Sequence, residues 1–212
     1  MMALTFIRQG YKDKGLDKED LNTDPVIQFE SWFEEAKKSE PIPTAMSLST
    51  VNNNGEPTLR TVLLKLFDKK GFVFFTNYKS RKADHITYNP NVAVLFNWVA
   101  LERQVIINGV AEKIKTKESI KYFMSRPRGS QLGAWVSDQS SVLSSRKVLE
   151  LKLEEMKHKF SDGEIPLPKF WGGYRIIPKT FEFWQGRPNR LHDRFIYSKL
   201  SNEIWDINRI AP

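Results

Sequence analysis

The chain has 212 residues, of which 40% are hydrophobic and 12% aromatic, so it can bury the core of a folded domain. Its 33 lysines and arginines outnumber 25 acidic residues and give a net charge of +8, which suits nucleic acid, an anionic membrane surface or a phosphorylated small molecule equally well. Cysteine is absent, which excludes disulfides, thiol nucleophiles and cysteine-based metal sites. No apolar run reaches the length of a signal peptide or membrane span, and we therefore expect a cytoplasmic protein.

The first predicted element is an amphipathic helix. Asp24 is a favoured capping residue, Pro25 fits the first helical position, and apolar residues recur at helical spacing through about Ser39. The pattern then changes to that of strands, predicted over residues 45–51, 58–67, 71–76, 92–98 and 104–115. Turn-forming residues at 52–55 and 68–71 connect the first strands as hairpins, which makes the sheet mainly antiparallel.

Helices are expected between and after these strands. Two short ones, at 80–88 and 116–125, are each opened by a hydroxyl residue and followed by a proline. A longer helix at 145–160 has one apolar stripe, typical of core packing. Further strands are predicted over 171–185, 194–199 and 203–209. Antiparallel strands with such helices predict a small β-barrel with peripheral helices, and no glycine-rich dinucleotide or Walker sequence indicates a doubly wound fold.

Two basic segments in the first half of the chain have the residues to bind an anion. Arg60 and Lys65 lie within an apolar strand, where a charge is costly unless it is paired or meets an anionic ligand. Strict alternation places them on opposite faces, so they share a ligand only through a bulge, and an edge strand with protective charges also explains them. Ser80 precedes Arg81 and Lys82 at a helix start, which is either a phosphate cradle or a capped helix with a solvated basic first turn.

Two further segments carry similar side chains. Tyr122, Arg126 and Ser130 are spaced four apart and share one helical face if the helix continues past Pro127, which would make a second phosphate clamp. Residues 184–194 contain three arginines and one of the three histidines behind a strand-like apolar run. This last segment is either an anion site with bidentate arginines or a solvated basic turn.

A conventional catalytic set is missing from the sequence. There is no cysteine and no histidine cluster with the spacing of metal ligands, so no metal site is predicted. His85 and His158 are expected on exposed helical surfaces. Anion-binding side chains without evident acid–base groups favour a protein that leaves the chemistry to a cofactor.

Short motifs along the chain recur together in one known family. They are residues 60–65 (Arg-Thr-Val-Leu-Leu-Lys), 75–77, 80–82, 125–127, 139–141, 171–174 (Trp-Gly-Gly-Tyr), 184–186, 189–194 (Asn-Arg-Leu-His-Asp-Arg) and 209–212. Each motif is weak alone, but in this order and spacing the chain resembles the pyridoxamine/pyridoxine 5'-phosphate oxidase family over nearly its whole length.

The resemblance implies a mainly β fold, an antiparallel split β-barrel with peripheral helices that binds FMN. It implies a single domain over residues 1–212, with a partly mobile N-terminal segment at 1–24 and strands for dimerisation and the active site at 170–212. Two copies would form a homodimer with FMN at the interface. The implied reaction oxidises pyridoxamine or pyridoxine 5'-phosphate with O₂ to pyridoxal 5'-phosphate and H₂O₂, with ammonia released from the amine, as the last step of vitamin B6 cofactor synthesis. Hydride would pass from the substrate C4′ carbon to the flavin.

The resemblance also implies a role for individual residues. FMN would be bound by Arg60, Thr61, Val62, Leu63, Leu64, Lys65, Phe75, Thr76, Arg81, Lys82, Gln104, Gln139, Ser140, Trp184 and Arg194. The substrate would be bound by Arg8, Tyr11, Lys65, Tyr122, Arg126, Ser130, Arg190, Leu191 and His192. Arg190 and His192 are the expected catalytic residues, because they would frame the pyridine ring against the flavin.

Two other functions stay open on the sequence. A different split-barrel flavoprotein, such as a flavin reductase, would have no use for the substrate-phosphate residues or for Arg190 and His192. A nucleic-acid-binding barrel fits the charge, but the basic residues cluster with hydroxyls in phosphate-sized groups, and no aromatic platform for bases lies between them. The expected partners are therefore the small-molecule substrate, O₂ and a second copy, with neither nucleic acid nor membrane.

Overall fold

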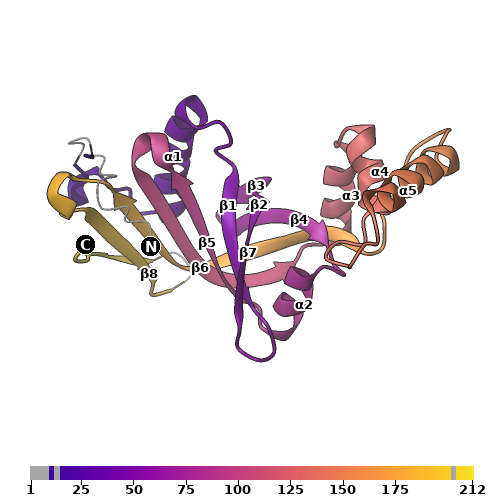
Figure 1. Cartoon of the computed structure of the whole chain (residues 1–212). Coiled ribbons are helices and arrows are strands. Elements are labelled where there is room, and N and C mark those ends of the chain that lie inside the picture. The colour runs from indigo at the N-terminus through magenta and orange to yellow at the C-terminus, as the bar shows by residue number, and fades with distance from the viewer. Residues whose placement is uncertain (1–9, 12–14, 202–203) are drawn as a thin grey trace, which may run out of the picture. The chain divides into compact units, whose positions relative to one another are not determined.

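The structure is a computed structural model that describes residues 10–11, 15–201 and 204–212. Its strands are β1 (Ala45–Val51), β2 (Pro57–Leu63), β3 (Leu66–Asp68), β4 (Gly71–Asn77), β5 (Asn91–Trp98), β6 (Arg103–Lys113), β7 (Trp171–Gln185), β8 (Asp193–Lys199) and β9 (Trp205–Arg209). The helices are α1 (Pro25–Ser39), α2 (Arg81–Tyr88), α3 (Thr116–Met124), α4 (Arg128–Val136) and α5 (Arg146–Lys159), with short 3₁₀ turns at Lys18–Asp20, Val99–Leu101 and Pro188–Arg190 (Figure 1).

The strands of the described residues pair into one sheet in the order β2-β1-β5-β6-β7-β4-β3, and β8 pairs with both β7 and β9. The pairings β3–β4, β4–β7, β7–β8 and β8–β9 are antiparallel. A tight turn sets the β3–β4 register: Asp68 pairs with Gly71 across it, as predicted.

Two compact units share the chain. Unit 1 comprises the residues through Leu48, Ala93–Gly109 and Pro178–Pro212, and unit 2 comprises Ser49–Val92 and Val110–Ile177. Strands β1, β5, β6 and β7 run from one unit into the other. No helix in the described ranges is long and apolar enough to cross a membrane.

Unit 1 has an aromatic core against α1. The Asp24 side chain accepts a hydrogen bond from the Val26 amide at 2.9 Å and Pro25 follows it, so α1 begins as the sequence predicted. Phe29, which is fully buried, contacts the ring of Phe96 at a centroid distance of 5.0 Å. Trp32 meets Phe183 of β7 edge to face at 5.2 Å. The apolar stripe of α1 is therefore a core-packing stripe.

Unit 2 has a second core where its helices meet. Figure 1 shows α3, α4 and α5 grouped together beyond the end of β4. Phe123 of α3 and Leu132 of α4 are buried with Ile165 and with Trp171 at the start of β7. This cluster fixes the helices that carry part of the cavity described below.

The structure departs from the elements expected from the sequence in three places. The strand expected over 58–67 is interrupted: β2 ends at Leu63, the side chain of Leu64 turns into the core at 2% exposure, and the Lys65 amide donates to Val73 O at 2.8 Å. The helix α4 was not predicted, because a proline was expected to end the preceding helix. In the structure Pro127 is also the N-cap of α4.

The third departure is a wrong prediction: His85 was expected on the surface. It is buried at 5% exposure on the inner side of α2, whereas His158 is exposed as predicted. The start of α3 differs in a smaller way. Its N-cap is Lys115, whose amide donates to Glu118 Oε2 at 3.2 Å, rather than a hydroxyl residue.

Candidate functional site

A cavity of about 720 Å³ lies within unit 2. Its walls come from β2, β4, the start of α2, the α3–α4 region and residues 137–140. It gathers most of the predicted site residues of this unit: Arg60, Thr61, Val62, Leu63, Lys65, Phe75, Thr76, Arg81, Lys82, Tyr122, Arg126, Ser130, Gln139 and Ser140. Leu64 is instead packed into the core.

The lining of this cavity is cationic. Arg60, Lys65, Arg81, Lys82 and Arg126 all contribute to it, and none of the lining residues that the structure describes is Asp or Glu. Burial, and as a second cause the nearby charge of Arg60, lower the pKa of Lys82 to about 8. Burial also lowers the pKa of Arg60, with repulsion from Arg81 as the second cause. Like charges held together without a carboxylate are the arrangement that an anionic ligand would stabilise.

Lys82, at the start of α2, donates hydrogen bonds to neutral groups. Its Nζ donates to Gln139 Oε1 at 3.0 Å, to Thr76 Oγ1 at 3.1 Å and to Ser80 Oγ at 3.3 Å. Thr76 Oγ1 also donates to Gln139 Oε1, and the Arg81 amide donates to Ser140 Oγ at 3.4 Å. These bonds join the 137–140 segment to the end of β4. They leave the charge of Lys82 uncompensated.

Arg126 has capacity to bind a ligand. Its guanidinium lies over the Trp171 ring at 4.6 Å from the centroid, and its buried Nη1 makes no hydrogen bond among the described residues. Tyr122 stacks on Phe75 at a centroid distance of 3.9 Å. Burial lowers the pKa of Arg126 and raises that of Tyr122. A phosphate oxygen would satisfy the unpaired donor.

Tyr122, Arg126 and Ser130 would share one helical face only if the helix continued past Pro127, and it does not. The helix α3 ends at Met124, and Ser130 belongs to α4. All three nevertheless line the same cavity. Arg60 and Lys65 also line it together, because the interruption of the strand at Leu64 removes the strict alternation that would have separated them.

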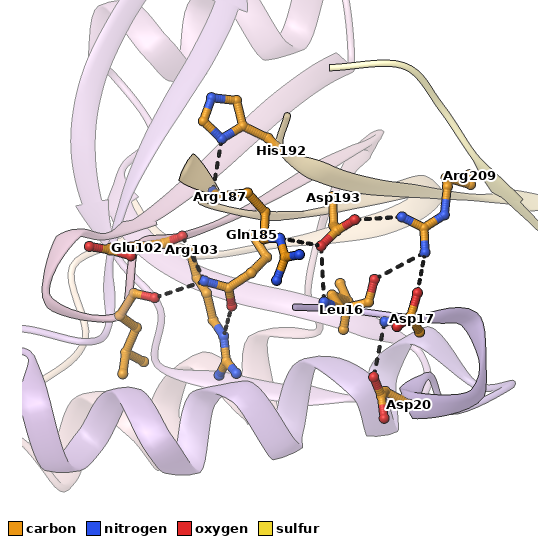
Figure 2. A network of polar contacts seen from close by, with 11 residues as sticks. Leu16, Asp17, Asp20, Glu102, Arg103, Gln185, Arg187, His192, Asp193 and Arg209 are labelled. Carbon is orange, nitrogen blue, oxygen red and sulfur yellow. Dashed lines mark hydrogen bonds and ion pairs between the residues drawn. The ribbon is translucent and has the colours of Figure 1, made fainter. Parts of the chain in front are cut away.

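The remaining predicted residues belong to unit 1, except for Arg8, which lies outside the described residues. Tyr11 meets Trp184 and His192 edge to face, at centroid distances of 5.8 and 5.1 Å. Gln104 is half-buried on β6. His192 Nδ1 accepts a hydrogen bond from the Arg187 amide at 3.1 Å, as Figure 2 shows. In the neutral ring this bond places the proton on Nε2, which is then a donor.

Asp193 is the centre of a polar network next to His192 (Figure 2). Its carboxylate accepts from the Leu16 amide at 3.1 Å and from Arg209 Nη1 at 2.5 Å, and it lies 3.5 Å from Arg187 Nε. Arg209 Nη2 also pairs with Asp17 at 2.6 Å. The network joins the segment before α1 to β8 and β9.

The arginine-rich turn divides into residues with different surroundings. Arg190 and Leu191 are exposed, and Arg190 has a left-handed φ of 63°. Arg194 pairs with Glu182 at 2.8 Å and donates to Ala211 O at 2.8 Å, so its charge is partly compensated within the protein. The turn is thus neither uniformly solvated nor a single cluster of uncompensated cations.

Sequence reasoning missed several residues of the cavity. Trp171, Asn77 and Ser137 were not assigned a role from the sequence, yet all three line the cavity. The Asn77 side chain donates to Ser137 O at 3.0 Å. Such a bond between distant segments has no local pattern in the sequence.

The sequence matches the models of a known protein family. A family model described as pyridoxamine 5'-phosphate oxidase matches residues 33–160, and one for the pyridoxine 5'-phosphate oxidase C-terminal dimerisation region matches residues 171–212. A pyridoxine/pyridoxamine 5'-phosphate oxidase of Rippkaea orientalis is 60% identical over 212 residues, with 100% of each chain covered.

Two solved structures are similar in fold. PhzG from Burkholderia lata, solved with tetrahydrophenazine-1-carboxylic acid, has a TM-score of 0.87 and 25% identity over 94% of this chain and 99% of its own. A pyridoxamine 5'-phosphate oxidase-related, FMN-binding protein from Nostoc punctiforme has a TM-score of 0.73 and 17% identity, over 91% of this chain and 100% of its own. The predicted antiparallel split-barrel fold is confirmed.

Proposed function

The chain belongs to the pyridoxamine 5'-phosphate oxidase family, and on that premise we propose that it is an FMN-dependent oxidase of vitamin B6 metabolism. It oxidises pyridoxine 5'-phosphate with O₂ to pyridoxal 5'-phosphate and H₂O₂. Pyridoxamine 5'-phosphate is oxidised with O₂ to an imine and H₂O₂, and water then hydrolyses the imine to pyridoxal 5'-phosphate and ammonia. This is the last step of vitamin B6 cofactor synthesis. The observation that carries the proposal is the cavity of unit 2, with five cations and no described carboxylate in its lining.

FMN and the substrate each carry a phosphate, and the cavity has two groups of cations to receive them. Arg60, Arg81 and Lys82 lie at β2 and the start of α2, and would bind the FMN phosphate. Lys65 and Arg126, with the hydroxyls of Tyr122 and Ser130, would bind the substrate phosphate. The unpaired Nη1 of Arg126 supports this assignment, because it is buried and already oriented.

When bound, FMN would supply the redox chemistry, because a flavin can take up the two electrons of the substrate C4′–H bond as a hydride and pass them to O₂. The protein contributes binding, orientation and exclusion of water. Phe75 and Tyr122, which stack at 3.9 Å, give the cavity an aromatic wall. This division of labour explains why no conventional acid–base set was found.

Residues of unit 1 enter the proposal by family resemblance. Arg190 and His192 would contact the pyridine ring, with Leu191 and Tyr11 beside it. The hydrogen bond from the Arg187 amide leaves His192 Nε2–H as the donor toward a ligand. Gln104, Trp184 and Arg194 are assigned to FMN on the same basis. The match of residues 171–212 to a dimerisation region supports a homodimer in which both copies contribute to each site.

The test is to purify the protein, release its flavin and measure peroxide with pyridoxamine 5'-phosphate. We expect the released flavin to be FMN. With either phosphorylated substrate, we expect peroxide and pyridoxal 5'-phosphate to form in equal amounts. Unphosphorylated pyridoxamine is the control and should react poorly, because it leaves the second group of cations without a partner. A flavin-free protein, or one without peroxide production, would overturn the proposal.

A further inference from the structure

The imidazole of His85 is buried although it takes no part in the cavity lining. It lies in α2, and its side chain is 5% exposed. Its Nδ1 atom is 3.2 Å from Thr50 Oγ1 on β1 and 3.4 Å from Thr58 Oγ1 on β2. Both hydroxyls are within hydrogen-bond distance, so the ring has polar partners on the side that faces the strands.

The same two hydroxyls hold Arg60. Arg60 Nη1 donates to Thr50 Oγ1 at 2.7 Å, and Arg60 Nη2 donates to Thr58 Oγ1. A guanidinium has donors only, so both threonine oxygens are acceptors toward it. Each threonine keeps its hydroxyl proton to donate: the Thr58 hydroxyl is 3.4 Å from the Thr50 carbonyl oxygen, and His85 Nδ1 can accept from either hydroxyl when the ring proton is on Nε2. His85, the two threonines and Arg60 thus form a hydrogen-bond relay from α2 through the strands to the cavity.

We propose that His85 is a positioning residue for Arg60, and that it acts through Thr50 and Thr58 to fix the guanidinium that binds the FMN phosphate. The inference rests on the proposed function. It supplies a role for a buried histidine that no part of the proposed reaction uses.

The charges around Arg60 explain why hydroxyl groups suit it as partners. Arg60 stands with Arg81 and Lys82 at the cavity, and mutual repulsion would drive a loosely held guanidinium toward solvent. A carboxylate partner would hold Arg60 but would cancel the charge that an anionic ligand needs. Hydroxyls that donate to the His85 ring hold the guanidinium and leave its charge intact.

The experiment measures FMN affinity of the apo-protein by the quenching of flavin fluorescence. Wild type should bind FMN, and His85→Leu should raise the Kd about tenfold, the effect of losing one oriented charged hydrogen bond. His85→Asn should recover most of the affinity, because its Oδ1 can occupy the place of Nδ1. His158→Leu removes an exposed histidine from α5 and is the matched control, with an unchanged Kd.

A double-mutant cycle tests whether His85 acts through Arg60. In an Arg60→Met background, His85→Leu should have no further effect on the Kd. Should His85→Leu fail to fold, Thr58→Val removes one hydroxyl at similar shape and should weaken binding in the same way. An unchanged Kd in the folded variants, or an equal loss with and without Arg60, would overturn the inference. If wild type itself does not bind FMN, the proposed function is what fails.

Discussion

Lys82 shows how single side chains prepare the cavity for an anion. Its three hydrogen-bond acceptors are neutral, and burial together with Arg60 lowers its pKa to about 8. A bound phosphate would stabilise the protonated amine, so above pH 8 binding must take up a proton that the free protein has lost. The charge of this residue therefore links cofactor affinity to pH.

We predict that the affinity for FMN falls as pH rises from about 8 toward 10, because Lys82 of the free protein becomes neutral over that range. Below pH 8 this residue contributes little pH dependence. Lys82→Arg keeps a positive charge throughout and should flatten that part of the profile. Fluorescence titrations at several pH values measure the effect. Identical slopes for wild type and variant would show that Lys82 is not the titrating group.

Arg126 is predicted to act on the substrate and not on FMN. Arg126→Met keeps an extended side chain against Trp171 but removes the buried donor Nη1. We expect the KM for pyridoxamine 5'-phosphate to rise at least about tenfold, with FMN affinity unchanged. Lys121→Met, an exposed position on α3, is the control. Loss of FMN binding in Arg126→Met would assign this residue to the cofactor instead.

Among the secondary-structure elements, those with strong local signals were predictable. The capped start of α1, the turn at 68–71 and the long strand β7 follow from residue types and periodicity. The interruption at Leu64 and the helix α4 depend on tertiary packing, since Leu64 is buried in the core and Leu132 of α4 packs with Ile165 and Trp171. The burial of His85 was unpredictable for the same reason: its partners come from two strands.

The pairing of β4 with β7 depends on two glycines. Gly173 pairs with Phe75 of the cavity wall, and a Cβ added at Gly172 would clash with the ring of Tyr78. The Tyr78 hydroxyl donates to Gly173 O at 3.1 Å, so the ring is held in place. The close approach explains the Gly-Gly pair that follows Trp171.

We predict that Gly172→Ala lowers the free energy of unfolding by about 1–3 kcal/mol, because Tyr78 must move and its hydrogen bond is lost. Gly129→Ala in α4 meets no atom within 4 Å and should be neutral or stabilising by up to about 1 kcal/mol. Chemical denaturation of both variants measures the difference. A Gly172→Ala protein as stable as wild type would show that the contact is easily relieved.

At the scale of the whole molecule, the proposed site requires two copies of the chain. The match of residues 171–212 to a dimerisation region indicates association. Leucines are exposed on strands at the ends of the strand order, with Leu59 of β2 at 69% and Leu66 of β3 at 49% exposure. Exposed apolar side chains on edge strands are unfavourable in an isolated chain and are typical of surfaces that a second copy covers.

Light scattering should therefore give a mass twice that of the 24.7 kDa chain. Leu66→Asp, which lies outside the cavity lining, should shift the protein toward monomer at micromolar concentration. Leu151→Asp changes a similarly exposed leucine on α5 and should leave the dimer intact. If Leu66→Asp is as dimeric as wild type, the interface does not include the edge of β3.

The proposed function requires that bound FMN take electrons directly from a phosphorylated B6 compound. The most direct measurement is the visible absorbance of the FMN-loaded protein mixed with pyridoxamine 5'-phosphate without oxygen. We predict stoichiometric bleaching of the flavin, formation of pyridoxal 5'-phosphate, and full return of the absorbance when O₂ is admitted. A flavin that stays oxidised under these conditions, while the substrate is bound, would show that FMN is not the electron acceptor.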